Sequence, residues 1–199
     1  MSFTIKKKCE SIIKVSNSKF IGIAFAYSNN FNDIKKQVKD LYPNASHYCY
    51  AYASDKVYKF SDDKEPEGTA GKPILNTLIN KDFNRVCIFV VRYFGGTKLG
   101  KANLAKAYRD CAINVLKNVE KYEIVQASTY KVKTGYKEYN QIEKLAKKYG
   151  YILDDVVYDE KIKFWILSKS KLGKSFFSLF KDIKILDEKY KEVLMLVKD

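Results

Sequence analysis

The chain has 199 residues, of which 46% are hydrophobic and 15% aromatic, and its formal net charge at neutral pH is +14. This composition is typical of a globular protein and excludes an intrinsically disordered one. The longest apolar run, residues 20–27, is too short to cross a bilayer, and no apolar segment follows the early lysines to form a secretory signal. We therefore expect a soluble cytoplasmic protein with no membrane partner.

The positive charge comes mainly from lysine, since Arg85, Arg92 and Arg109 are the only arginines. A charge of this size favours polyanionic partners such as RNA, DNA or the ribosome. A lysine-rich composition that only solvates the surface explains the charge equally well. Charge alone leaves both interpretations open.

The four cysteines, Cys9, Cys49, Cys87 and Cys111, lie far apart and form no C-x-x-C pair, and the chain has a single histidine. A structural zinc site needs clustered thiolates or imidazoles. We therefore expect reduced, mostly buried thiols, and neither a metal nor a cofactor.

The first part of the sequence predicts an α+β domain. Phe31, Ile34 and Val38 recur at helical spacing, and residues 85–91 form a short apolar run typical of a buried strand. The predicted strands cover residues 4–15, 19–27, 46–53, 56–60 and 85–91, and the predicted helices cover residues 30–41, 71–80 and 99–119.

The remaining sequence predicts a β-α-β-β-α-β unit of the ferredoxin-like kind. Ile162, Phe164 and Ile166 alternate with Lys161, Lys163 and Trp165, which indicates a strand with one buried face. The boundary near residues 122–125 predicts two domains, residues 1–123 and 124–199. The strands of the second are expected at residues 126–134, 151–158, 161–167 and 184–197, and its helices at residues 138–149 and 172–183.

The strand that begins at His47 places His47 and Cys49 on one face and Tyr48, Tyr50 and Tyr52 on the other. A histidine and a cysteine on one face could form a base and a nucleophile. Since no third activating group is evident, we favour a small core residue for Cys49 and leave His47 open between a structural and a functional role. The tyrosines are expected to pack in a core or an interface rather than to stack on bases.

An acidic loop follows, with Asp62, Asp63, Glu65 and Glu67 within six residues. Carboxylates at this density can bind Mg²⁺ or orient basic side chains. They can also serve turn chemistry, in which aspartates accept hydrogen bonds from backbone amides. We favour the structural interpretation slightly over a metal site.

The acidic loop leads into a predicted helix through Gly68, Thr69, Ala70 and Gly71. The amides at a helix N-terminus attract phosphate, and Lys72 adds a cation there. This segment is therefore a candidate phosphate site.

A second loop, residues 95–101, has the G-x-x-x-x-G-K spacing of a phosphate loop between a predicted strand and helix. Ala102 stands where such a loop needs a hydroxyl to bind Mg²⁺. Phosphate binding by Gly95, Gly96, Lys98 and Gly100 is compatible with the sequence, whereas ATP or GTP hydrolysis by this route is not expected.

Arg92 ends the strand before that loop. It can pair with a carboxylate of the acidic loop, or its planar guanidinium can bind phosphate or an RNA backbone. The two roles are compatible with each other.

Three segments, residues 47–52, 61–75 and 90–100, resemble the signatures of the YigZ/IMPACT family of translation-associated proteins in its two-domain bacterial form. The resemblance implies an N-terminal α/β sandwich similar to the second domain of a small-subunit ribosomal protein. It also implies a ferredoxin-like domain similar to the last domain of elongation factor G. The usual Thr-Gly-Gly-Leu continuation is here Lys101-Ala102-Asn103-Leu104. The two loops are expected to meet in one ligand-binding rim made of His47, Asp62, Asp63, Glu65, Gly68, Thr69, Gly71, Lys72, Arg92, Tyr93, Gly95, Gly96, Lys98 and Gly100.

The sequence and the resemblance together predict a regulatory protein that binds RNA or the ribosome and modulates translation. One alternative is an enzyme that acts on a small phosphorylated or nucleotide ligand, with His47 as acid–base and Asp62 and Asp63 as metal ligands. The other is a module that binds a protein partner in translation control, as the IMPACT branch of the family implies.

Overall fold

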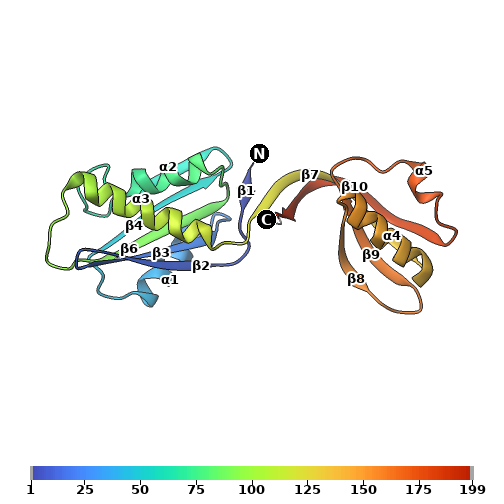
Figure 1. Ribbon diagram of the computed structural model, residues 1–199, viewed down its shortest axis with the longest axis horizontal. Coiled ribbons are helices and arrows are strands. Elements are labelled where there is room, and N and C mark those ends of the chain that lie inside the picture. Colours follow the sequence, from blue (N-terminus) through green and yellow to red (C-terminus); the bar gives the residue numbers. More distant parts are fainter. Residues whose placement is uncertain (1, 198–199) are drawn as a thin grey trace. The chain divides into compact units, whose positions relative to one another are not determined.

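The computed structural model describes residues 2–197, which divide into two compact units. Residues 2–123 with Leu196 and Val197 form the first unit, and Ile124–Met195 form the second (Figure 1). Both units combine helices with an antiparallel sheet, which confirms the predicted α+β fold. Within the described residues, no helix has the length and apolar character needed to span a bilayer.

The first unit is a sheet with helices on both faces (Figure 1). Helices α2 (Gly71–Asn80) and α3 (Lys101–Lys117) cover one face, and α1 (Phe31–Leu41) covers the other. The sheet order is β2-β3-β6-β4-β5, with β2 at Cys9–Val15, β3 at Ser18–Ala26, β6 at Val86–Tyr93, β4 at His47–Ser54 and β5 at Val57–Ser61.

Strand β6 is the centre of this sheet, and its residues from Val86 to Arg92 are all buried. Ile88 and Val90 face α2 and α3, whereas Phe89 and Val91 face α1. A strand covered on both faces needs apolar residues at every position, which explains the continuous apolar run in the sequence. Arg92 lies at the end of this run, so its charge enters an apolar environment.

The tyrosine row of β4 packs on the α1 face, as expected. Tyr52 is buried, and Tyr50 lies 5.3 Å from Phe89 and 4.6 Å from Phe31 between ring centroids. Tyr48 packs against the same core. The prediction that these tyrosines are packing residues is confirmed.

The second unit has the sheet order β10-β7-β9-β8, with α4 and α5 packed on one face. This chain order of β-α-β-β-α-β is the one predicted from the sequence. The elements are β7 (Tyr122–Thr134), α4 (Tyr136–Tyr149), β8 (Ile152–Val157), β9 (Ile162–Ser168), α5 (Lys174–Phe177) and β10 (Ile183–Leu196).

Two predicted elements are wrong in extent. The first predicted strand is split into β1 (Phe3–Thr4), which pairs with the start of β7, and β2. The helix predicted at residues 172–183 is only the single turn α5. Asp182 explains the short helix, because its carbonyl accepts a hydrogen bond from Thr134 Oγ1 and its carboxylate pairs with Lys161 at 2.6 Å. These contacts direct the chain into β10 before a second helical turn can form.

A close backbone approach explains one glycine of the second loop. A Cβ atom on Gly95 would lie 2.0 Å from the backbone carbonyl of Asn17, in the turn between β2 and β3. The adjacent Gly96 has open space around it and a φ of +85°. Gly95 is therefore required for packing, whereas Gly96 is favoured by its backbone conformation.

We predict that Gly95→Ala lowers the free energy of unfolding by about 3 kcal/mol, the upper range for overpacking, because the β2–β3 turn must move. Gly96→Ala is the matched control and should cost about 1–2 kcal/mol, the penalty of the left-handed conformation. Urea unfolding of both variants measures the difference. Equal losses would show that the turn accommodates the methyl group and that the close approach is unimportant.

Candidate functional site

A pocket of about 380 Å³ lies where β4 begins and β6 ends. His47 on β4 and Arg92 on β6 are direct partners in the sheet register, so the strand pairing places them together. The acidic loop and the first turn of α3 complete the pocket. Its lining residues are His47, Glu65, Pro66, Arg92, Phe94, Lys98, Leu99, Gly100, Lys101 and Leu104.

A buried ion pair forms the base of this pocket. Arg92 Nη1 donates to Glu65 Oε1 at 2.6 Å, and both side chains are no more than 5% exposed. Arg92 Nη2 donates to Ser18 Oγ at 3.3 Å. The guanidinium carbon lies 5.3 Å from the ring centroids of both Phe20 and Phe94. Arg92 therefore pairs with the acidic loop, through Glu65 rather than through Asp62 or Asp63.

Glu65 is also held by a residue of α3. Tyr108 Oη donates to the same Oε1 atom at 2.7 Å, and burial raises the pKa of this tyrosine, so it remains a hydrogen-bond donor. His47 Nε2 lies 3.7 Å from Oε1, and His47 Nδ1 lies 2.8 Å from the Asp63 carbonyl. Glu65 thus contacts side chains from β4, β6 and α3.

The side chains of Asp62 and Asp63 accept hydrogen bonds from backbone amides and do not line the pocket. Asp62 accepts hydrogen bonds from the amides of Gly68, Ala70 and Gly71 at 2.8–2.9 Å, which neutralises the N-terminus of α2. Asp63 accepts one from the Tyr48 amide at 2.6 Å. Both are engaged in the turn chemistry that the sequence suggested.

The hydrogen bonds to Asp62 use the backbone amides that were expected to bind phosphate at the start of α2. Asp62 already occupies the amides of Gly68 and Gly71, Thr69 Oγ1 donates to the Pro66 carbonyl at 2.6 Å, and Lys72 is exposed outside the pocket. Among the described residues, no three or more His, Cys, Asp or Glu side chains gather in a way that could hold a metal ion.

The second loop contributes more directly. Lys98, Gly100 and Lys101 line the pocket, and α3 begins at Lys101. The first turn of a helix has N–H groups without intrahelical acceptors and carries partial positive charge. Gly95 and Gly96 shape the loop without lining the pocket, and Tyr93 Oη donates to the Pro43 carbonyl at 3.0 Å.

Six contributors to the site were not among the predicted site residues: Pro66, Phe94, Leu99, Lys101, Leu104 and Tyr108. Leu104 and Tyr108 belong to the inward face of α3, where four-residue spacing assigns them to the core. Lys101 lies three residues before Leu104, about one helical turn, so the two lie on the same side of α3 and the sequence could have predicted Lys101 as a site residue. Nothing in the local sequence identifies Tyr108 as the partner of Glu65.

Cys49 is a core thiol. Its Sγ donates to the Asp62 carbonyl at 3.0 Å and lies 3.4 Å from Tyr108 Oη, and burial raises its pKa. A thiol that stays protonated is a poor nucleophile. The structural interpretation of Cys49 is confirmed.

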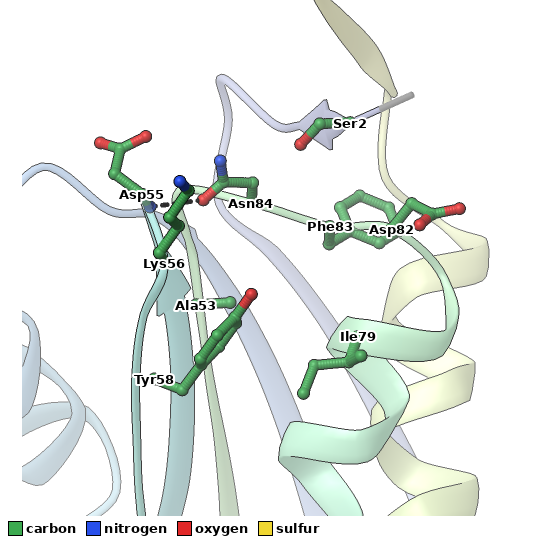
Figure 2. A pocket seen from close by; sticks show the side chains of 9 residues that line it. All are labelled: Ser2, Ala53, Asp55, Lys56, Tyr58, Ile79, Asp82, Phe83 and Asn84. Atoms are coloured by element: carbon green, nitrogen blue, oxygen red, sulfur yellow. Dashed lines mark hydrogen bonds between the residues drawn. The ribbon is translucent and has the colours of Figure 1, made fainter.

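A second pocket, of about 420 Å³, lies at the opposite end of β4 (Figure 2). Two aspartates, Asp55 and Asp82, line it. Asp55 pairs with Arg85 at 3.0 Å, and its amide donates a hydrogen bond to Asn84 Oδ1. Tyr58 and Ile79 form part of its wall. Because none of the three motif segments reaches this second pocket, we take the His47 pocket as the candidate site.

Thiol reactivity tests the assignment of Cys49. We predict that a disulfide reagent at mildly alkaline pH modifies only Cys9 rapidly, because burial raises the pKa of Cys49, Cys87 and Cys111 and excludes the reagent. All four thiols should react in denaturant. The Cys9→Ser variant is the control and should lose the fast phase. A second fast phase that disappears in Cys49→Ser would restore the nucleophile hypothesis.

Unfolding measurements test the ion pair. We predict that Arg92→Ala lowers the free energy of unfolding by about 3–5 kcal/mol, because it leaves the Glu65 charge buried without a partner. Adding Glu65→Gln should recover part of this loss, since the unpaired charge is then gone. Arg109→Ala, at an exposed position of α3, is the matched control. A loss for Arg92→Ala no larger than that of the control would contradict a structural role.

Comparisons with known proteins identify the family of this chain. The family profile described as the Impact N-terminal domain matches residues 16–116, which include all the pocket residues. IMPACT family member YvyE of Bacillus subtilis is 30% identical over 167 residues, covering 81% of this chain and 77% of that protein. YigZ of Escherichia coli is 31% identical over 140 residues, covering 66% and 68%.

An IMPACT family member of Haemophilus influenzae is 36% identical over 118 residues, covering 57% of each chain. A crystal structure described as that of a hypothetical protein has the same fold, with a TM-score of 0.61 and 22% identity over 100% of this chain and 98% of that one. The match of the N-terminal domain and the extent of the YvyE alignment show that this chain belongs to the IMPACT family.

Proposed function

We propose that this protein is a cytoplasmic, translation-associated regulator that binds RNA or the ribosome through the His47 pocket of its first unit. The observation that carries the proposal is the combination of lysines at the rim of that pocket with apolar side chains in its wall. The role in translation follows from the family resemblance of the three sequence motifs.

The charge of the pocket suits an anionic ligand. The Arg92 charge is compensated by Glu65, so the charges left at the rim are those of Lys98 and Lys101. Both lysines are exposed and come from the loop and the first turn of α3. Ammonium groups beside a helix N-terminus form a favourable environment for a phosphate.

The apolar part of the pocket suits a base. Phe94 is 47% exposed, and its ring lies against the buried guanidinium of Arg92, which holds it at the rim. Leu99 and Leu104 provide apolar surface beside it. An aromatic ring next to lysines is the arrangement by which proteins bind single-stranded nucleic acid without strong sequence preference.

The enzyme alternative has less support. His47 lines the pocket, but Asp62 and Asp63, which that mechanism would use as metal ligands, accept hydrogen bonds from backbone amides. The protein-partner alternative has one specific observation in its favour. Edge strand β5 exposes Val57, Tyr58 and Phe60, and an exposed apolar edge can pair with an added strand.

RNA-binding measurements with a labelled single-stranded oligonucleotide test the proposal. Lys98→Ala and Lys101→Ala should each reduce the slope of log affinity against log salt by about 0.7, the value for one phosphate contact of a single strand. Phe94→Ala should cost about 1–3 kcal/mol, the contribution of one stacked base. These effects should be similar for different RNA sequences.

Lys14→Ala is the control, because Lys14 is an exposed lysine of β2 that does not line the pocket. Changing it should alter affinity little. If the three pocket variants bind RNA as tightly as the unaltered protein, the His47 pocket is not the RNA site.

A further inference from the structure

The sheet of the second unit has one face covered by helices and one face formed by strand residues. On the covered face, Tyr139 and Ile142 of α4 pack with residues such as Phe164 of β9. The apolar cluster on the opposite face contains strand residues alone within the described chain. We call this opposite face the tryptophan face and define it by Trp165, Lys131, Lys133, Lys163, Lys189 and Lys191.

The strand register places these side chains together. Lys131 of β7 is the direct partner of Trp165 on β9, and Lys133 is the direct partner of Lys163. Directly paired residues of an antiparallel sheet point to the same face. Lys191 comes from β10, and its Nζ lies 5.4 Å from the Trp165 ring centroid. Three strands thus contribute cations around a single indole.

The charges of the tryptophan face are poorly compensated. Like charges that lie directly opposite each other destabilise a sheet, and Lys133 and Lys163 have this arrangement without an ion-pair partner among the described residues. Lys189 pairs with Asp187 at 2.7 Å. Asp154, the other direct neighbour of Trp165, is the remaining carboxylate in this register. Five lysines therefore face two aspartates, and the imbalance favours an anionic ligand.

The indole is placed for stacking. Trp165 is half-buried, with Lys131 Nζ at 5.7 Å and Lys191 Nζ at 5.4 Å from its ring centroid. In the free protein these lysines cover the indole and gain cation–π attraction. One ammonium group would be enough to cover the indole. Covering the indole therefore explains neither the second ammonium group at the same ring nor the adjacent Lys133–Lys163 pair. A base on the indole would let the displaced ammonium groups contact the flanking phosphates.

We propose that the tryptophan face is a second RNA-binding site, which takes a single-stranded segment with one base stacked on Trp165 and its phosphates on the surrounding lysines. A four-stranded sheet whose exposed aromatic residues stack on bases is a common way to recognise unpaired RNA. The inference rests on the proposed RNA binding for the nature of the ligand and adds a site that is separate from the His47 pocket. Stacking on a single aromatic ring makes the site sequence-tolerant, because every base has a face that can stack.

Trp165 is the only tryptophan in the chain, so its fluorescence reports on this site directly. The full-length protein is titrated with a single-stranded oligouridine RNA, and tryptophan emission is recorded together with the anisotropy of the labelled RNA. The emission should be quenched in parallel with the rise in anisotropy. The quenching should persist in the Lys98→Ala/Lys101→Ala variant, whose substitutions lie in the other unit.

Variants separate binding from stability. Trp165→Ala should weaken binding about 5- to 150-fold, the equivalent of one lost base stack, while Trp165→Phe keeps a ring and should retain most of the affinity. Lys133→Ala should weaken binding at low salt and leave the melting temperature unchanged or raised, because it removes a like-charge pair. Lys144→Ala, at an exposed position of α4, is the matched control and should change neither quantity.

The outcomes distinguish the two sites. If anisotropy rises while tryptophan emission stays constant, RNA binds elsewhere and the tryptophan face is not a site, although the proposed function stands. If emission is quenched but the His47 pocket variants bind normally, the tryptophan face is the RNA site and the pocket is not. If anisotropy does not rise at all, both proposals are wrong.

Discussion

The carboxylate of Glu65 connects the parts of the first unit that form the pocket. It lies in a loop, yet it accepts hydrogen bonds from Arg92 at the end of the central strand and from Tyr108 on α3. A carboxylate that leaves water needs such partners, because its desolvation costs several kcal/mol. The loop is therefore fixed to the sheet and to the helix at once. Asp62, in the same loop, accepts hydrogen bonds from amides at the N-terminus of α2, so the loop is also fixed to a second helix.

Local patterns predicted most elements of the fold because helices and strands repeat their apolar residues at different periods. α1 and α2 follow from spacing alone. The errors arise where distant contacts decide the structure. Phe176 and Phe180 have the spacing of a helix, but the hydrogen bond from Thr134 to Asp182 joins residues 48 positions apart and ends the helix early. The short strand β1 pairs with Tyr122 and is equally invisible in the local sequence.

The sequence predicted several residues of the site but not which side chains pair with each other. Sequence motifs identified His47, Arg92 and the second loop, yet the acidic loop offered several carboxylates as partners for the arginine. The choice of Glu65 depends on a turn in which Asp63 and Lys64 adopt positive φ angles and the Glu65 amide donates to the Asp62 carbonyl at 2.9 Å. Such a reversal has no periodic signature. It turns Asp62 toward the helix and Glu65 toward the sheet.

A lysine-rich composition does not by itself make a binding site, and the structure offers a direct comparison. Lys14 and Lys19 are direct partners in β2 and β3, so like charges also meet in the first unit. Within the part of the chain that the structure describes, neither Lys14 nor Lys19 lies over an aromatic ring, whereas two ammonium groups lie within 6 Å of the Trp165 centroid. Unspecific surface charge would spread over the sheet, but here two of the cations lie over the same aromatic ring. The convergence, rather than the net charge of +14, is the reason for proposing a nucleic-acid surface here.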